Sequence, residues 1–204
     1  MPDYYYTQEP ASAHKERSIT ARALGLTLSF ETDAGVFSTN ELDPGSKLLI
    51  ESMGALSGRV LDLGCGAGPV GIYAAKICGA ENVVMADIDP RAVSAAARNA
   101  GANGLTIAAF VSDGFRQLTE TGFDAIYSNP PYQSDFAVAR HFIEKGFNRL
   151  NIGGSLFMVT KRRAWYENKL RAIFGGCRVT ERDGYFVFSA QKRSARYANA
   201  RPSK

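Results

Sequence analysis

The turn formed by Ser128, Asn129, Pro130, Pro131 and Tyr132 suits chemistry on an amino nitrogen. An amino group conjugated to a π-system is planar and a poor nucleophile, because its lone pair is delocalised. The side-chain oxygen of Asn129 and the carbonyl of Pro130 can each accept one N–H bond, which favours a pyramidal nitrogen whose lone pair points at a methyl group. Proline makes the turn rigid, and the ring of Tyr132 offers a stacking face for a planar target. Asn129, Pro130 and Tyr132 are therefore the predicted catalytic residues.

A glycine-rich segment, 60–71, follows an expected strand and opens an expected helix. Glycines at Gly64, Gly66 and Gly68 allow positive φ and let the backbone, with Cys65 among them, approach a ligand closely. Gly66, Gly68 and Gly71 also satisfy the dinucleotide-binding pattern, and Asp87 lies where a ribose contact is expected. The loop and Asp87 together indicate an adenosine-containing cofactor.

Asp62 favours S-adenosylmethionine over a dinucleotide as the adenosine-containing cofactor. A carboxylate at the end of the first strand of the sheet is unfavourable beside a pyrophosphate but favourable beside a cation. S-adenosylmethionine carries a sulfonium and an ammonium and has no phosphate. We therefore predict that Asp62 faces S-adenosylmethionine, and a role in binding N–H groups of the loop is compatible with this.

The segment Ser112, Asp113, Gly114 and Phe115 follows the third strand of the expected sheet. Asp113 can accept a hydrogen bond from the adenine amino group, while Phe115 or Ile88 covers the ring. The alternative is an ordinary Asp turn.

The elements that must position these residues alternate regularly along the chain. We expect strands at 59–63, 82–86, 106–111, 123–128 and 155–160, and helices at 69–78, 89–99, 136–150 and 165–174. Strand–helix alternation predicts a doubly wound α/β fold with a mostly parallel sheet. Strands at 177–181 and 185–190, around the turn at 182–184, add a C-terminal antiparallel hairpin and bring the sheet to seven strands. In such sheets ligands bind beyond the carboxyl ends of the strands.

Three units are expected along the chain. Residues 1–40 form an N-terminal extension that contains a short β-hairpin at 18–23 and 26–31. Residues 41–191 form the main domain, which begins with a helix capped by Asp43 and Pro44 and running through Met53. Residues 192–204 form a basic, flexible tail.

Length and composition exclude several classes of protein. The chain has 204 residues, of which 45% are hydrophobic and 22% charged, as expected for a globular domain rather than a disordered or collagen-like chain. No apolar stretch approaches the roughly 20 residues that a membrane span needs, and the N-terminus does not resemble a secretory signal. We expect Cys65, Cys78 and Cys177 to be free thiols in a reducing cytoplasm.

Charge is distributed unevenly. Residues 1–160 hold 12 Lys and Arg against 17 Asp and Glu, whereas residues 161–204 hold 12 against 3. A compact positive region favours a polyanionic partner, because bound Lys and Arg displace condensed counterions. Lys161, Arg162 and Arg163 directly follow an expected central strand and are predicted to contact such a substrate. We expect Trp165 and Tyr166 to pack their helix onto the sheet rather than to stack on RNA.

The residues quoted so far resemble a known family. Asp62 to Gly68, Asp87 and Asn129 to Tyr132 resemble class I S-adenosylmethionine-dependent methyltransferases acting on amino nitrogens. The segments 35–38 and 42–49 resemble, more narrowly, the small-domain ribosomal RNA guanine-N2 methyltransferases. The resemblance runs from about residue 26 to 190 and implies a Rossmann-like fold, the cofactor S-adenosylmethionine, and ribosomal RNA or a ribosomal particle as the partner. It also implies that Phe37, Ser38 and Asp43 lie near the methionine end of the cofactor.

The chain departs from the larger members of that family, which carry an additional degenerate methyltransferase-like half. RNA docking by that half cannot be assumed here. We expect the N-terminal extension and the basic C-terminal end to take over RNA docking from the missing half. A homodimer is another way to replace that half.

Other readings stay open. The same motif serves methylation of a protein glutamine amide or of an adenine or cytosine amino group, although no long N-terminal helical domain or target-recognition domain is evident. A nicotinamide oxidoreductase leaves Asn129 to Tyr132 without a role. A non-catalytic RNA-binding module has no need of Asp62, Asp87 and Asn129 together. His14 and His141 have no cysteine at metal-ligand spacing, so no metal site is predicted, and we expect His141 to be an ordinary, partly exposed helix residue.

Overall fold

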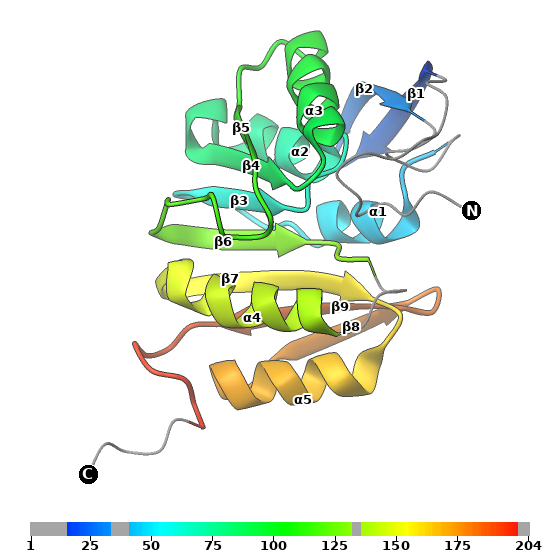
Figure 1. Ribbon diagram of the computed structural model, residues 1–204. Helices are drawn as coiled ribbons and strands as arrows, with labels where there is room; N and C mark the ends of the chain where they lie inside the picture. The colour runs from blue at the N-terminus through cyan, green and yellow to red at the C-terminus, as the bar shows by residue number, and fades with distance from the viewer. Residues whose placement is uncertain (1–15, 34–40, 132–135, 200–204) are drawn as a thin grey trace.

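Seven strands form one mixed sheet in the computed structural model, which describes residues 16–33, 41–131 and 136–199. The strand order is β5-β4-β3-β6-β7-β9-β8 (Figure 1). Strand β9 lies between β7 and β8 and runs antiparallel to both, whereas the other neighbouring pairs are parallel. The predicted α/β fold class is confirmed. The strands are β3 (Val60–Leu63), β4 (Val83–Asp87), β5 (Ala108–Val111), β6 (Phe123–Ser128), β7 (Leu150–Thr160), β8 (Arg178–Arg182) and β9 (Tyr185–Gln191).

Successive residues of each strand point to opposite faces of the sheet, which divides the core into two layers. Val60 of β3 packs with Ile72 and Tyr73 on one face, whereas Leu61 packs with Ile143 on the other. Helices α1, α2 and α3 therefore cover the first face, and α4 and α5 cover the second. The helices are α1 (Pro44–Glu51), α2 (Pro69–Cys78), α3 (Pro90–Ala102), α4 (Ala137–Arg149) and α5 (Arg163–Phe174), with a short 3₁₀ turn at Ala80–Asn82.

Proline at the first helical position begins α1, α2 and α3, as predicted for α1 from Asp43-Pro44. Asp43 and Asp89 cap α1 and α3, since their carboxylates accept the backbone N–H groups of Ser46 at 2.9 Å and Arg91 at 2.8 Å. The cap predicted at Asp43 and the helix start predicted at Asp89 are confirmed.

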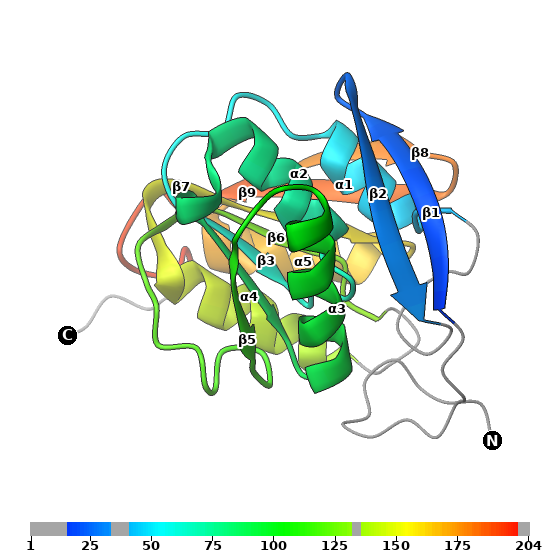
Figure 2. The same cartoon turned by 90° about the horizontal axis from the view of Figure 1, so that it is seen from above.

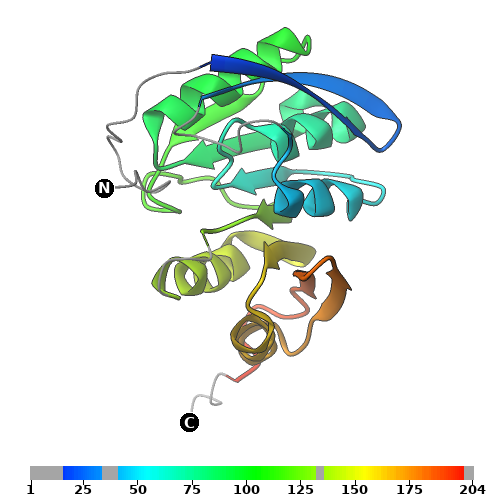
Figure 3. The same ribbon diagram turned by 90° about the vertical axis from the view of Figure 1, so that its right-hand side faces the viewer.

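The predicted N-terminal hairpin forms a separate two-stranded sheet of β1 (Glu16–Ala23) and β2 (Leu26–Asp33). Leu24 and Gly25 have positive φ, which is the backbone of the tight turn that joins such strands. The hairpin lies beside the main sheet in Figure 2. In Figure 3 it crosses in front of α3. Ile19, Leu28 and Phe30 bury their side chains in the core layer that contains α2.

The segment after β9 differs from the flexible tail that its composition predicts. Lys192 is buried, and its ammonium donates to the Leu150 carbonyl at 2.7 Å. Tyr197 packs edge-on against Phe147, and the N–H of Ala198 donates to the Ile173 carbonyl at 3.0 Å. Charge composition alone misses this, because it does not show that the Lys192 ammonium has a specific backbone carbonyl as its partner. Residues 192–199 therefore lie on α4 and α5.

Candidate functional site

The four loops singled out in the sequence meet at one edge of the sheet. Strand β3 lies between β4 and β6, so the chain order reverses there and the carboxyl ends of β3 and β6 are neighbours. Leu63 pairs with Ser128 across this point, and the Ser128 hydroxyl donates to the Leu63 carbonyl at 2.8 Å. The N–H of Gly64 donates to the Ala86 carbonyl at 2.8 Å. The glycine loop therefore lies between the end of β4 and the turn that holds Asn129.

The glycine loop has the backbone that its sequence predicts. Gly64, Gly66 and Gly68 all have positive φ, which other residues adopt only with strain. Gly68 caps α2 without a side-chain bond, and a Cβ on Gly68 would lie 3.0 Å from the Cβ of Ala96. The loop therefore needs glycine both for its conformation and for its packing.

Two carboxylates accept backbone N–H groups from this loop and from the segments next to it. Asp62 is buried and accepts the N–H of Gly71 at 2.8 Å, so it binds the first turn of α2. Asp87 accepts the N–H of Gly66 at 2.8 Å and the N–H of Asp89 at 3.0 Å. Asp62 thus has the loop-binding role that its sequence position allows.

Burial makes both carboxylates costly to ionise without a positive partner. Burial and, to a smaller extent, the nearby Asp87 carboxylate raise the pKa of Asp62 to about 7, against the opposing effect of the bond from Gly71. Burial also raises the pKa of Asp87. A cationic group placed at this loop would offset the cost, whereas an anionic phosphate would increase it.

Cys65 lies in the loop between these carboxylates, and its thiol is buried in the core. Burial, with Asp87 and Asp62 nearby, raises the pKa of Cys65 well above its ordinary value. Its backbone N–H donates to the Ala86 carbonyl at 3.0 Å. The side chain is therefore an unreactive packing group, and only the backbone of Cys65 belongs to the loop surface.

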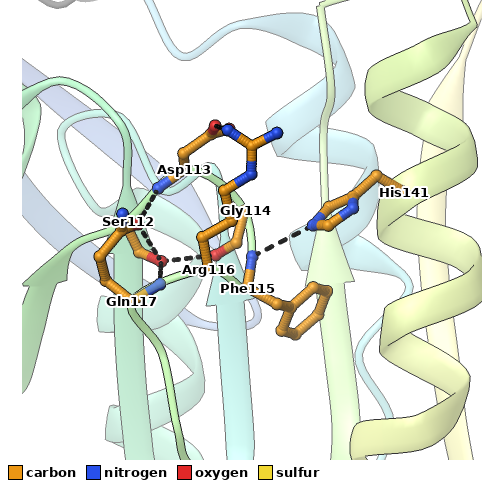
Figure 4. A network of polar contacts seen from close by, with 7 residues as sticks. All are labelled: Ser112, Asp113, Gly114, Phe115, Arg116, Gln117 and His141. Atoms are coloured by element: carbon orange, nitrogen blue, oxygen red, sulfur yellow. Dashed lines mark hydrogen bonds and ion pairs between the residues drawn. The ribbon is translucent and has the colours of Figure 1, made fainter.

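The segment after β5 forms a tight polar turn (Figure 4). The hydroxyl of buried Ser112 donates to the Gly114 carbonyl at 2.8 Å and accepts the N–H of Gln117 at 3.2 Å. The N–H of Asp113 donates to Gln117 Oε1 at 2.8 Å, while its half-exposed carboxylate pairs with Arg116 at 2.5 Å. Ser112 therefore fixes the turn, and Asp113 is the member whose carboxylate reaches the surface.

His141 of α4 is a neighbour of this turn that the sequence does not reveal. Its Nε2 lies 3.5 Å from the N–H of Phe115 (Figure 4), and a Cβ on Gly114 would lie 2.8 Å from its ring. Burial lowers the pKa of His141, which favours the neutral ring that can accept this N–H. The sequence favours an ordinary partly exposed residue here, since no local pattern links His141 to a turn 26 positions earlier.

Phe115 packs edge-on against Phe142 inside the core and is only 4% exposed. Ile88 is half-buried beyond the end of β4. Of the two residues that could cover an adenine ring, Ile88 is the one at the surface.

Asn129 projects from the carboxyl end of β6 and meets α1. Its Nδ2 donates to Asp43 Oδ2 at 2.6 Å and to Ser46 Oγ at 3.3 Å. Pro130, which follows it, is buried. The candidate reacting turn is thus held by a helix that is distant in the sequence. Tyr132, Phe37 and Ser38, which we also predicted for the site, lie outside the described residues.

Basic side chains gather beside this edge, where β7 ends next to β6. Lys161, Arg162 and Arg163 are exposed and lie over the rings of Tyr185, Phe136 and Phe186, at 4.6, 5.2 and 5.8 Å from the ring centres. Trp165 is half-buried and stacks on Phe136 at 4.2 Å, while Tyr166 is buried. The predicted packing role of Tyr166 is confirmed. We call Lys161, Arg162 and Arg163 the basic triplet.

Within the described parts of the chain, no group of three His, Cys, Asp or Glu could hold a metal ion. No helix among these residues is long and apolar enough to cross a membrane. Cys65, Cys78 and Cys177 are free.

Comparison with known proteins gives consistent results. The family "Methyltransferase small domain" matches residues 27–189. The uncharacterized protein YbxB of Bacillus subtilis is 31% identical over 200 residues, which is 94% of this chain and 100% of YbxB. Ribosomal RNA small subunit methyltransferase C of Haemophilus ducreyi is 38% identical over 163 residues, which is 76% of this chain and 49% of that protein.

Solved structures extend the comparison. The T. thermophilus 16S rRNA N2 methyltransferase RsmC, in complex with AdoMet and guanosine, superimposes with a TM-score of 0.79 at 32% identity, over 91% of this chain and 52% of RsmC. The ribosomal protein L11 methylase of Lactobacillus delbrueckii has a TM-score of 0.62 at 22% identity, which indicates a common fold alone. The chain spans the full length of YbxB but about half the length of the methyltransferase C relatives.

Proposed function

This chain belongs to the methyltransferase small domain family, and from that premise we propose that it methylates the exocyclic amino group of a guanine in ribosomal RNA, with S-adenosylmethionine as the methyl donor. One observation carries the proposal. The Asn129 carboxamide stands at the end of β6, beside a glycine loop that the carboxylates of buried Asp62 and half-buried Asp87 support. The T. thermophilus methyltransferase RsmC, which superimposes on 91% of this chain, is in complex with AdoMet and guanosine.

The residues at the sheet edge fit S-adenosylmethionine. The cofactor supplies a methyl group on a sulfonium, and its positive charges suit the carboxylates whose ionisation is otherwise costly. We assign Asp62 and the backbone of Gly64 to Gly68 to the methionine side, and Asp87 to the ribose hydroxyls. Each carboxylate oxygen of Asp87 accepts one N–H and can accept a second donor. Ile88, Ser112, Asp113 and Gly114 form the adenine side, and Phe37 and Ser38 remain proposed members of the methionine side.

Asn129 and Pro130 act on the amino nitrogen. The Asn129 side-chain oxygen and the Pro130 carbonyl accept its two N–H groups, which localises the lone pair toward the methyl group. Tyr132 is proposed to stack on the base. The nitrogen gains a methyl group and loses one proton to water, so no strongly basic side chain is required. Positioning of the amine accounts for much of the acceleration.

The basic triplet is proposed to hold the RNA. Its three cations are exposed at the end of β7, which pairs with β6, so they flank the reacting turn. Contacts of Lys and Arg with phosphates position a nucleic acid without reading its sequence. Because the chain spans about half of the methyltransferase C relatives, this surface or a homodimer is proposed to replace their additional half. Ribosomal RNA as the substrate also places the protein in the cytoplasm.

The test is nucleoside mass spectrometry of ribosomal RNA from cells with and without the gene. We expect N2-methylguanosine to fall by one residue per ribosome in the deletion strain. Wild-type protein restores it, and Asn129→Ala does not, although the variant still binds S-adenosylmethionine in calorimetry. A variant that lost cofactor binding as well would contradict the role assigned to Asn129.

The alternatives give different outcomes in the same strains. Loss of a methylated glutamine from a protein, with all ribosomal nucleosides intact, would identify the protein as an amide methyltransferase. Loss of a methylated adenine or cytosine would identify that base, rather than guanine, as the substrate. Full rescue of the strain's phenotype by Asn129→Ala would indicate a non-catalytic RNA-binding role.

A further inference from the structure

The nitrogen of the Asn129 carboxamide is engaged by the first turn of α1. Its Nδ2 donates to Asp43 Oδ2 at 2.6 Å and to Ser46 Oγ at 3.3 Å. A carboxamide nitrogen carries two hydrogens, so these two acceptors use both. The oxygen Oδ1 is then the atom of Asn129 that can receive an N–H from another molecule.

The chemistry of Asp43 decides which end of the carboxamide faces it. The nitrogen and oxygen of an asparagine side chain have nearly the same shape, so either orientation fits sterically. An ionised carboxylate has no hydrogen to donate. An Asn129 oxygen 2.6 Å from Asp43 would be repelled, whereas the nitrogen forms a charge-assisted bond. Asp43 therefore selects one orientation of Asn129.

Gly45 allows this close approach. A Cβ on Gly45 would lie 3.0 Å from Asp43 Oδ2 and 3.1 Å from Asn129 Nδ2. Such distances are tighter than ordinary contacts, so a side chain at this position would press on the bond between the two residues. The φ of Gly45 is not positive, which means that space rather than backbone conformation requires glycine here.

Asp43 is itself fixed to a rigid support. Its Oδ2 accepts the N–H of Ser46 at 2.9 Å, and its carbonyl accepts the N–H of Lys47 at 2.9 Å. Leu49 and Ile50 of the same helix are fully buried in the core. The carboxylate therefore cannot follow Asn129 if that side chain turns, and it acts as a fixed reference for the carboxamide.

We propose that Asp43 is a positioning residue for the transfer step, which holds the Asn129 carboxamide with Oδ1 directed at the substrate amine. This inference rests on the proposed function. The bond to a carboxylate also polarises the carboxamide, and this makes Oδ1 a stronger acceptor. Asp43 contacts neither the reacting nitrogen nor the methyl group in this role, since it acts through Asn129.

The decisive variant is Asp43→Ser. Serine caps helices about as well as aspartate, so α1 keeps its first turn. Its hydroxyl is held closer to the backbone than Oδ2 and carries no charge, so the charge-assisted bond to Asn129 and the selection of one orientation are lost. We expect the rate of methyl transfer at saturating RNA and cofactor to fall roughly 10²-fold, as for a small misplacement of a reacting group. The dissociation constant for S-adenosylmethionine, measured by calorimetry, stays unchanged.

Ser52→Ala is the matched control. Ser52 caps the other end of α1, where its hydroxyl donates to the Leu49 carbonyl at 2.7 Å, and it does not contact Asn129. This variant loosens the same helix and should keep the wild-type rate. An equal loss in Ser52→Ala and Asp43→Ser would mean that α1 matters only as a structural element, and the inference would be wrong.

A double-mutant cycle separates positioning from general damage. If Asp43 acts through Asn129, then Asp43→Ser costs nothing further in a chain that already carries Asn129→Ala. If the two losses multiply instead, Asp43 has an independent role and the inference is overturned.

A spectroscopic measurement tests the contact without any activity. In ¹⁵N–¹H spectra of the protein alone, the Asn129 side-chain NH₂ should exchange slowly with water and lose this protection in Asp43→Ser but not in Ser52→Ala. An Asn129 amide that is unprotected in the wild type would refute the bond. If this protection is present but wild-type protein methylates no ribosomal guanine, the proposed function fails and the orientation of Asn129 stands.

Discussion

The side chain of Asn99 and the backbone of Glu31 form two reciprocal hydrogen bonds. The Glu31 N–H donates to Asn99 Oδ1 at 2.7 Å, and Asn99 Nδ2 donates to the Glu31 carbonyl at 2.9 Å. Asn99 Nδ2 also donates to the Ala67 carbonyl of the glycine loop at 2.9 Å. One buried side chain of α3 therefore joins the N-terminal hairpin to the loop assigned to the cofactor.

Asn99→Ala should destabilise the protein by roughly 2–3 kcal/mol, because it leaves several buried backbone groups without partners. Asn103→Ala is the control. Asn103 pairs in the same way with the backbone of Ser29, but closer to the surface, so water can replace it at a cost of about 1 kcal/mol or less. Urea denaturation of both variants measures the difference. Equal losses would contradict a special role for the buried pair.

Asp87→Ala should weaken S-adenosylmethionine binding strongly. The substitution removes the proposed acceptor of the ribose hydroxyls and also releases the Gly66 N–H. Hydrogen bonds to a charged group contribute about 1.5–3 kcal/mol each, which corresponds to roughly a tenfold or larger loss of affinity. Calorimetry with the purified protein measures the change. Unchanged affinity would refute the ribose contact.

The stability of the cofactor-free protein should fall as the pH rises from about 4 to about 7 and then level off. The pKa of Asp62 is about 7 in the folded protein and near 3.8 in the unfolded chain, so the folded state binds the proton more tightly. The stabilisation from this group is complete below the unfolded value and is lost as the pH rises through the folded value. The raised pKa of Asp87 acts in the same direction.

Chemical denaturation between about pH 4.5 and 7.5, which spans most of the interval between the unfolded and folded pKa values, tests this dependence, with Asp62→Asn as the comparison. The variant cannot ionise at this position and should lose less stability over the same range. A wild-type protein and variant with the same pH dependence would show that Asp62 is already ionised in the folded state.

Replacing the basic triplet by serine should weaken RNA binding and reduce its salt dependence. Each phosphate that the variant no longer neutralises lowers the slope of log affinity against log salt by about 0.7–0.9. Arg22→Ser, an exposed cation on the hairpin, is the control and should leave the slope unchanged. Methyl transfer to free guanosine should be equal in the wild type and both variants. A normal salt slope in the triplet variant would place the RNA elsewhere.

Local sequence signals predicted most elements accurately. Helix α2 has the predicted bounds because Pro69 begins it and Gly79 follows its last residue, Cys78. Strand β7 begins at Leu150 rather than at the predicted position 155. The predicted strand leaves out Gly153 and Gly154, but Gly153 donates to the Lys192 carbonyl and Gly154 accepts the Lys192 N–H, in the segment after β9. That pairing partner is distant in sequence and leaves no local pattern.

The site likewise combines residues that local sequence patterns reveal with contacts to elements that are distant in the sequence. The glycines and Asp87 follow strand ends, so the rule for doubly wound sheets is enough to place them together. Asp43 was predicted as a helix cap and, from the family resemblance, as a neighbour of the cofactor, but its bond to Asn129 depends on how α1 packs against the end of β6. His141 and buried Lys192 likewise have partners on other elements, and neither residue type nor spacing indicates them.

The most direct test of the account is a crystal structure of the protein with S-adenosylhomocysteine and guanosine. We predict that adenosylhomocysteine lies along Gly64 to Gly68, with its ribose at Asp87. The guanine amino nitrogen should lie about 3 Å from Asn129 Oδ1, within hydrogen-bond distance. A cofactor bound elsewhere, or an Asn129 oxygen turned away from the guanine amino group, would contradict it.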